Sequence, residues 1–270
     1  MTLSRGMRLA LAVFTVLALV VVYTPLALVV LNSFNADRTF AWPPSELTLH
    51  WWEVAIGARG ARDALWLSVE VAAVATVVAL VLGTLAAMAL SRFRFFGQNT
   101  VSLLIILPIA LPGIVTGIAL NNAFRTIFAW ELGFLTIVVA HATFCIVTVF
   151  NNVQARMRRM GGNLEEASMD LGAGGFTTFR LVTFPMLRSA LLAGALLAFG
   201  LSFDEIVVTT FTAGTQQQTL PLWIFNNLFR PNQAPVVNVV AAVLVVVSIV
   251  PIYFAQRLSG SHNEGLTGAR

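Results

Sequence analysis

The chain has 270 residues, of which 58% are hydrophobic and only 10% are charged. Soluble domains carry about 25% charged residues, so this composition excludes an ordinary globular domain and indicates an integral membrane protein. The net charge of +4 comes from 16 basic residues, all of them arginine, and no separate basic domain is present to bind nucleic acid. We therefore expect an all-α protein whose main environment is the lipid bilayer.

Six apolar segments are long enough to cross the hydrocarbon, which takes about 20 helical residues. The first follows two arginines and lacks a small-residue cleavage site, so we expect a retained span and not a removable signal peptide. Two shorter segments, Ser45–Ile56 and Thr219–Phe229, are predicted as helices at the outer membrane surface. The predicted spans are residues 9–31, 65–90, 101–123, 133–152, 187–209 and 236–256.

The third predicted span contains Pro108, Pro112, Gly113 and Gly117. Proline and glycine together predict a kinked or broken helix. Broken backbone inside a membrane is tolerated where it faces protein or a water-filled cavity. This span is therefore a candidate for a solute pathway, with a purely structural kink as the equal alternative.

A polar stretch, residues 163–185, interrupts the apolar pattern after the fourth span. Asn163 is a residue type that caps helices, and Glu166 three positions later completes a capping-box pattern. Gly172 is expected to end this helix, because glycine adopts the left-handed conformation of a helix end without penalty. A second short helix is expected from Phe176 to Phe184, before a proline. The stretch predicts two short helices outside the lipid.

The arginines indicate the topology. With both termini in the cytoplasm, the inner segments hold eleven arginines and the outer segments hold five, which agrees with the positive-inside bias. This orientation puts the polar stretch in the cytoplasm. The inner arginines are Arg5, Arg8, Arg92, Arg94, Arg156, Arg158, Arg159, Arg180, Arg188, Arg257 and Arg270.

Several ionisable or aromatic residues lie within or beside the predicted spans. Asp204 and Glu205 fall in the outer part of the fifth span, where an acid facing a water-filled path would attract a cation; an ion pair with an arginine is the structural alternative. For His141 a packing role is favoured, and a hydrogen bond between spans is a further possibility. Trp223 and Phe225 are candidates for stacking on a cation, although anchoring at the interface is the commoner role of such aromatics.

The polar stretch resembles the EAA loop of bacterial ABC importer permeases. That pattern is Glu-Ala-Ala, three residues, Gly, nine residues, Ile, one residue and Leu-Pro. Here Glu166-Ala167-Ser168 is followed at the same spacing by Gly172, Val182 and Phe184-Pro185, with three mild substitutions. The prolines of the third span, the LSFDEIVVTTFTAG segment and TLPLWIFNNL extend the resemblance to the second permease subunit of polyamine (spermidine/putrescine) importers.

The resemblance implies a type I importer permease fold, with residues 1–60 as first span and outer loop, 61–256 as permease core and 257–270 as cytoplasmic tail. It implies a homologous second permease, two ATPase subunits and an extracytoplasmic binding protein, in the bacterial inner membrane. ATP and Mg²⁺ would bind the partner ATPase, because this chain has no phosphate-loop motif. Neither a metal site nor a catalytic set is expected. The residues expected to couple to the ATPase are Glu165, Glu166, Ala167, Ser168, Asp170, Gly172, Phe176 and Arg180.

Two other classes of function remain open from the residues alone. An ATP-independent channel or secondary transporter would have a similar number of spans. An intramembrane enzyme would need paired catalytic groups, for which Glu70 and His141 are the one candidate pair. Within the permease class, another small cationic or amino-acid-like solute is the alternative to a polyamine.

Overall fold

The protein is all-α, as its composition predicts. The computed structural model describes residues 4–38 and 43–260, with side chains as far as Val247. Within this part of the chain, helices are the sole regular elements apart from an isolated β-bridge between Asn35 and Leu47. The chain divides into two compact units: unit 1 comprises Met1–Ala61 and Ile224–Arg270, and unit 2 comprises Arg62–Trp223.

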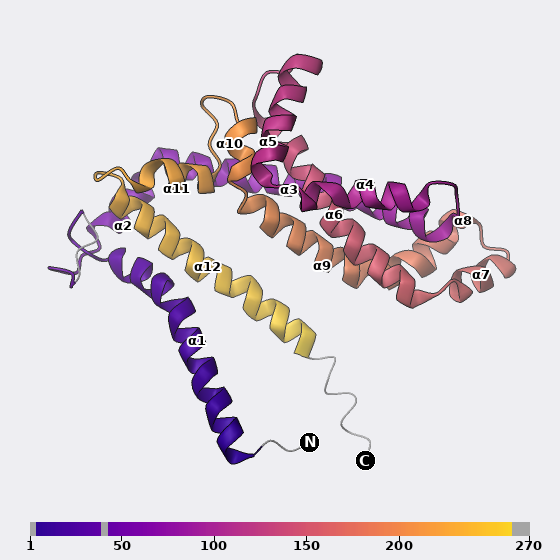
Figure 1. Ribbon diagram of the computed structural model, residues 1–270, viewed down its shortest axis with the longest axis horizontal. Helices are drawn as coiled ribbons and strands as arrows, with labels where there is room; N and C mark the ends of the chain where they lie inside the picture. Colours follow the sequence, from indigo (N-terminus) through magenta and orange to yellow (C-terminus); the bar gives the residue numbers. More distant parts are fainter. Residues whose placement is uncertain (1–3, 39–42, 261–270) are drawn as a thin grey trace. The chain divides into compact units, whose positions relative to one another are not determined.

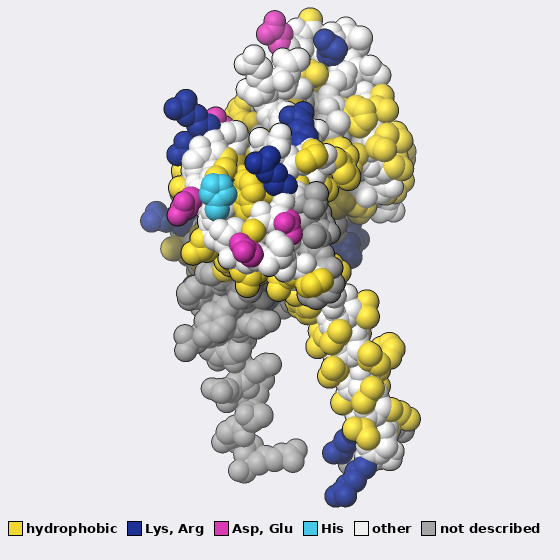
Figure 2. Space-filling model, turned by 90° about the vertical axis from the view of Figure 1, so that its left-hand side faces the viewer, with side chains coloured by type: hydrophobic (Ala, Val, Ile, Leu, Met, Phe, Trp, Pro, Cys, Tyr) yellow, Lys and Arg dark blue, Asp and Glu magenta, His cyan; other side chains and the backbone are white. Residues whose placement is uncertain are grey.

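Unit 1 is built around two long helices, α1 (Arg5–Asn32) and α12 (Ala234–Gly260), which contact each other, and a short helix, α2 (His50–Gly57), which contacts α12 (Figure 1). The Ser4 hydroxyl accepts a hydrogen bond from the Met7 amide and caps the start of α1. Figure 2 shows hydrophobic side chains along the whole of α1, with basic side chains at its free end. A helix that is apolar all round and uncovered by protein is typical of a lipid-facing span.

Unit 2 has a core made by three long helices: α3 (Arg59–Arg92, whose first turn lies in unit 1), α6 (Phe134–Met160) and α9 (Phe184–Phe203). Helices α6 and α9 run side by side (Figure 1). The contact between α3 and α6 depends on Gly83, because a Cβ there would lie 2.9 Å from the Ile146 carbonyl oxygen. Small residues of this kind let helices in membranes approach closely.

The third predicted span is broken, and the break is sharper than a kink. Helix α4 (Gln98–Ala110) and helix α5 (Gly113–Asn122), which continues into the π-helical turn η1 (Ala123–Ile127), meet at an angle of 105°. Leu111 is extended directly before Pro112, as a residue before proline prefers, and Pro112 has no N–H to donate, so the hydrogen-bond ladder of α4 ends there and α5 begins after Pro112. The predicted break is therefore confirmed.

Among the described residues, four helical segments are long and apolar enough to cross a membrane, or five if the bent pair counts as one span. They are α1, α3, α6 and the continuous segment Gly175–Phe203. Helix α12 is 27 residues long, but its side chains are described only to Val247, so the sixth span stays a prediction. Residues 261–270 of the predicted tail lie outside the described residues, and the predicted domain boundaries stay predictions.

The two predicted surface helices are both present, with different bounds. Helix α2 begins at His50, five residues later than predicted. The preceding segment instead pairs its backbone with the chain after α1: the Ala36 amide donates to the Glu46 carbonyl, and the Thr48 amide donates to the Phe34 carbonyl. Helix α11 (Leu220–Leu228) agrees closely with the prediction.

Candidate functional site: the helical hairpin and the broken fifth span

The polar stretch forms a helical hairpin whose first helix, α7, spans Asn163–Asp170. The prediction that Asn163 caps this helix is wrong. Gly162 occupies the capping position, and its carbonyl oxygen accepts hydrogen bonds from the Glu165 and Glu166 amides. Asn163 therefore already lies inside the first turn, and no side chain caps the helix.

The turn of the hairpin is at Gly172, as predicted. Gly172 has a φ of 87°, in the left-handed region that favours glycine. Its amide donates to the Met169 carbonyl oxygen over 2.8 Å, which closes the end of α7. The hydroxyls of Ser168 and Thr178, 3.1 Å apart, then join α7 to the second helix. Ser168 thus has a structural partner inside the hairpin.

The second helix does not end before Pro185, contrary to the prediction. Helix α8 (Gly175–Thr178), the π-helical turn η2 (Phe179–Thr183) and α9 follow one another without a gap, so Gly175–Phe203 is one continuous helical segment. In η2 the Phe184 amide donates to the Phe179 carbonyl, one residue further back than in an α-helix. This wider turn lies directly before the proline, where an α-helix is otherwise disturbed by the missing N–H.

An ion pair ties the hairpin to the end of α3. The Glu165 carboxylate accepts from the Arg92 guanidinium through one oxygen, and from the Thr183 hydroxyl through the other over 2.7 Å. Arg92 ends α3, Glu165 lies on α7 and Thr183 lies directly before α9. One carboxylate therefore joins three segments, and its side chain is only 12% exposed.

The rest of the hairpin surface is open and partly apolar. Leu171 is 90% exposed, Phe176 77%, Leu164 56% and Met169 51%. Glu166, Ala167, Asp170 and Arg180 are exposed as well. Of the eight predicted coupling residues, Glu165 and Ser168 thus have side-chain partners within the chain, whereas Glu166, Ala167, Asp170, Gly172, Phe176 and Arg180 face outward.

The predicted fifth span breaks at the two acids. Helix α9 ends at Phe203, and a six-residue helix, α10 (Val207–Thr212), follows. The Glu205 carboxylate accepts a hydrogen bond from the Val208 amide over 2.8 Å and so caps α10. Asp204 is exposed, and within the described residues it forms no side-chain ion pair. The two neighbouring acids therefore differ: Glu205 caps α10, and Asp204 has no ion-pair partner in the part of the chain that the structure describes.

His141 bridges this break, which confirms a hydrogen-bonding role between spans. Its Nδ1 lies 2.8 Å from the Ser202 hydroxyl on α9, and its Nε2 lies 2.9 Å from the Thr209 hydroxyl on α10. All three side chains are buried. The imidazole thus satisfies one hydroxyl on each side of the break.

The two short helices that follow breaks, α5 and α10, pack against each other. The Asn121 side-chain amide donates to the Phe211 carbonyl oxygen over 2.5 Å. The Thr136 hydroxyl donates to the Thr212 carbonyl over 2.7 Å and fixes the end of α10 to the start of α6. The break beside Asp204 is therefore held by buried polar contacts on several sides.

The remaining predicted residues lie apart from this cluster. Glu70 is exposed on α3, whereas His141 is buried. On α11, Trp223 is buried at the end of unit 2, and Phe225, in unit 1, is 57% exposed. Substrate contacts of Asp204, Glu205, Trp223 and Phe225 stay predictions.

Sequence reasoning missed Arg92 and Thr183 as parts of the hairpin site. Arg92 served only as a topological charge, and Thr183 occupied one of the variable positions of the EAA pattern. One signal was available, since Arg92 lies at the predicted inner end of a span and the neighbouring polar stretch carries carboxylates that are able to pair with it. Nothing in the spacing indicated that Glu165 would be that partner.

Comparisons with known proteins agree with these features. Residues 79–262 match the family described as binding-protein-dependent transport system inner membrane component. The chain belongs to this family. It is 34% identical over 240 residues to the putrescine transport system permease protein PotI of Escherichia coli K12, covering 86% of this chain and 84% of PotI. It is 32% identical over 246 residues to the spermidine/putrescine permease PotC of the same strain, covering 91% and 92%.

The fold has a solved counterpart. A bacterial ABC transporter involved in the import of the acidic polysaccharide alginate matches with a TM-score of 0.71 and 16% identity, over 97% of this chain and 99% of that one. At this identity the likeness concerns the fold alone. The importer permease fold is thus confirmed. The family match and the two sequence relatives confirm the assignment of this chain as an ABC importer permease subunit.

Proposed function

We propose that this permease imports a polyamine, putrescine or spermidine, as half of the translocation pathway of an ATP-driven transporter. The observation that carries the proposal is the identity of 32–34% to permeases named for these solutes, across most of both chains. The complete transporter would contain a second permease, two ATPase subunits and an extracytoplasmic binding protein. ATP and Mg²⁺ would bind the ATPase subunits, and this chain would carry no nucleotide site.

The hairpin α7–α8 is proposed as the surface that docks on the ATPase. Its exposed apolar side chains, above all Leu171 and Phe176, support this role, because they would be buried against a partner. The arginine distribution supports a cytoplasmic hairpin and cytoplasmic termini. Closure of the ATPase dimer would move the hairpin, and the continuous helix that starts in α8 would move with it.

Asp204 is proposed to meet the cationic substrate. An exposed carboxylate beside a broken helix attracts ammonium groups, and it has no competing ion pair within the described residues. Glu205 is the weaker candidate, because its carboxylate already caps α10.

The test is uptake of labelled putrescine and spermidine into proteoliposomes that contain the complete transporter and its binding protein. We expect ATP-dependent uptake. Excess unlabelled polyamine should inhibit this uptake by competition, and a neutral amino acid should not. Asp204→Asn should leave assembly intact and lower uptake by about tenfold, if one charge contact is worth about 1.5 kcal/mol. Asp63→Asn, which changes an exposed acid of α3 outside the hairpin and outside the break, is the matched control for charge.

Three outcomes would contradict the proposal in different ways. Uptake without ATP would show a channel or secondary transporter. ATP-dependent uptake of another solute would keep the permease and change the substrate. Normal polyamine uptake by a folded Asp204→Asn variant would remove Asp204 from the pathway.

A further inference from the structure

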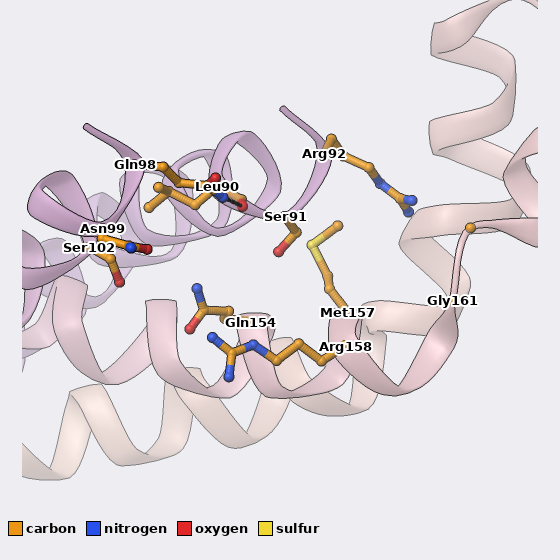
Figure 3. A pocket seen from close by; sticks show the side chains of 11 residues that line it. Leu90, Ser91, Arg92, Gln98, Asn99, Ser102, Gln154, Met157, Arg158 and Gly161 are labelled. Carbon is orange, nitrogen blue, oxygen red and sulfur yellow. Dashed lines mark hydrogen bonds between the residues drawn. The ribbon is translucent and has the colours of Figure 1, made fainter. Parts of the chain in front are cut away.

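A polar pocket of about 390 Å³ lies in unit 2, next to the hairpin. It is lined by the end of α3, the start of α4 and the end of α6, which carries Arg158 and Gln154 (Figure 3). The volume is within the range of about 300–1,000 Å³ that small-molecule sites have. No carboxylate is among the lining residues, all of which the structure describes.

The two arginines of the pocket point in different directions. Figure 3 shows Arg92 directed away from the amide side chains, toward the hairpin, where it pairs with Glu165. A Cβ at Gly162 would lie 3.2 Å from a Glu166 carboxylate oxygen and 3.6 Å from an Arg92 nitrogen, so a second acid is close to that end. The charge of Arg92 is therefore balanced.

The positive charge of Arg158 is not balanced by a carboxylate within the described residues. Its side chain runs back along α6, and its guanidinium lies beside the Gln154 side chain, one turn away on the same helix face (Figure 3). Within the described residues, Arg158 forms no ion pair and no hydrogen bond through its side chain. The pocket therefore has a net positive end with a free guanidinium.

Neutral donors surround that end of the pocket. Asn99 and Ser102 of α4 face Gln154 across the cavity (Figure 3). The Gln98 amide is not available, because it donates to the Leu90 carbonyl over 2.6 Å. A free guanidinium, two carboxamides and a hydroxyl match the several acceptor oxygens of a phosphate group, which arginine binds through paired N–H donors.

We propose that this pocket binds a phosphate group, supplied by the headgroup of an anionic phospholipid or by free phosphate. Basic pockets between transmembrane helices on the cytoplasmic side bind anionic headgroups, and the end of α6 carries three arginines: Arg156, Arg158 and Arg159. A ligand there would contact both α4 and α6 next to the point where the hairpin leaves α6. The proposal holds whatever solute the permease carries.

The test uses the full chain in phosphatidylcholine nanodiscs, with two arms. In the lipid arm, phosphatidylglycerol is added to the nanodiscs and retained lipid is measured by native mass spectrometry. In the other arm, inorganic phosphate is titrated against nanodiscs without anionic lipid and binding is measured by calorimetry. Binding in the first arm alone assigns the site to a lipid headgroup, and binding in the second arm identifies free phosphate as a ligand.

Arg158→Gln should weaken binding about tenfold in whichever arm is positive. Arg159→Gln is the matched control: it removes the same charge from the next position of α6, is exposed, and does not line the pocket. A second variant, Asn99→Asp, places a carboxylate in the pocket and should abolish binding. Equal losses in Arg158→Gln and Arg159→Gln, or no binding in either arm, would overturn the proposal.

Discussion

The hairpin at α7–α8 and the break between α9 and α10 both interrupt helices. They differ in whether the side chains around them are buried within the chain or left exposed. At the break, polar groups from α6, α9 and α10 are buried and satisfy one another around His141. At the hairpin, one carboxylate is held by Arg92 and Thr183, and the leucines and phenylalanine nearby are left uncovered. The polar groups of the break are satisfied within this chain, whereas the apolar side chains of the hairpin stay exposed, available to the partner proposed above.

Changes at the break should therefore reduce stability, and changes on the hairpin surface should reduce association. His141→Ala should have the largest effect on stability. It leaves the buried Ser202 hydroxyl without its imidazole partner, which costs about 1–3 kcal/mol, whereas the Thr209 hydroxyl retains its hydrogen bond to the Glu205 carbonyl oxygen. The midpoint of thermal unfolding, measured on the purified chain in detergent, should fall clearly below that of His50→Ala, an exposed histidine. Equal midpoints would show that His141 does not hold the break.

Gly172→Ala should have the next largest effect. The left-handed φ of 87° is unfavourable for a residue with a Cβ, and the expected cost is about 1 kcal/mol. Gly174→Ala is the matched control, because Gly174 has a φ of −68° and free space around a Cβ. Hydrogen exchange of the hairpin amides should rise in Gly172→Ala and not in the control.

The Arg92–Glu165 pair should contribute about 1 kcal/mol or less, since both side chains retain some exposure. A double-mutant cycle with Arg92→Gln and Glu165→Gln measures this coupling through the unfolding midpoint. The double variant should be no less stable than the worse single variant. Strictly additive losses would mean that the two side chains act independently.

Leu171→Ser should leave the unfolding free energy within about 0.5 kcal/mol, because the side chain is 90% exposed. The same change should sharply lower the amount of ATPase that co-purifies with the complete transporter. Phe128→Ser, which alters a residue 54% exposed in unit 2 but outside the hairpin, is the control and should retain the ATPase. Unchanged co-purification in Leu171→Ser would contradict docking through this surface.

Much of the fold was predictable because hydrophobic length determines it. The apolar runs set α1, α3 and α6, and prolines predicted the break between α4 and α5. The hairpin turn was predictable from Gly172, since few residues other than glycine adopt its conformation. Local signals of this kind need no knowledge of what the segment touches.

Features that depend on the exact course of the backbone were not predictable. Asp204 and Glu205 are adjacent acids, and only the course of the chain after Phe203 makes one a cap and leaves the other free. The capping role of Asn163 failed because Gly162 begins the helix, although both residue types occur at helix starts. Pro185 indicated a helix end, and the wide turn before it carries the helix through.

That wide turn has a mechanical consequence. Because the helix continues through Pro185, the segment Gly175–Phe203 is one continuous helix with a length of about 42 Å, at ~1.5 Å per residue. One end emerges from the hairpin, and the other stops at the Asp204 carboxylate. Because this helix is continuous, we expect a displacement applied at Gly175 to be transmitted toward Asp204. The geometry would link a conformational change of the ATPase to the position of the Asp204 carboxylate.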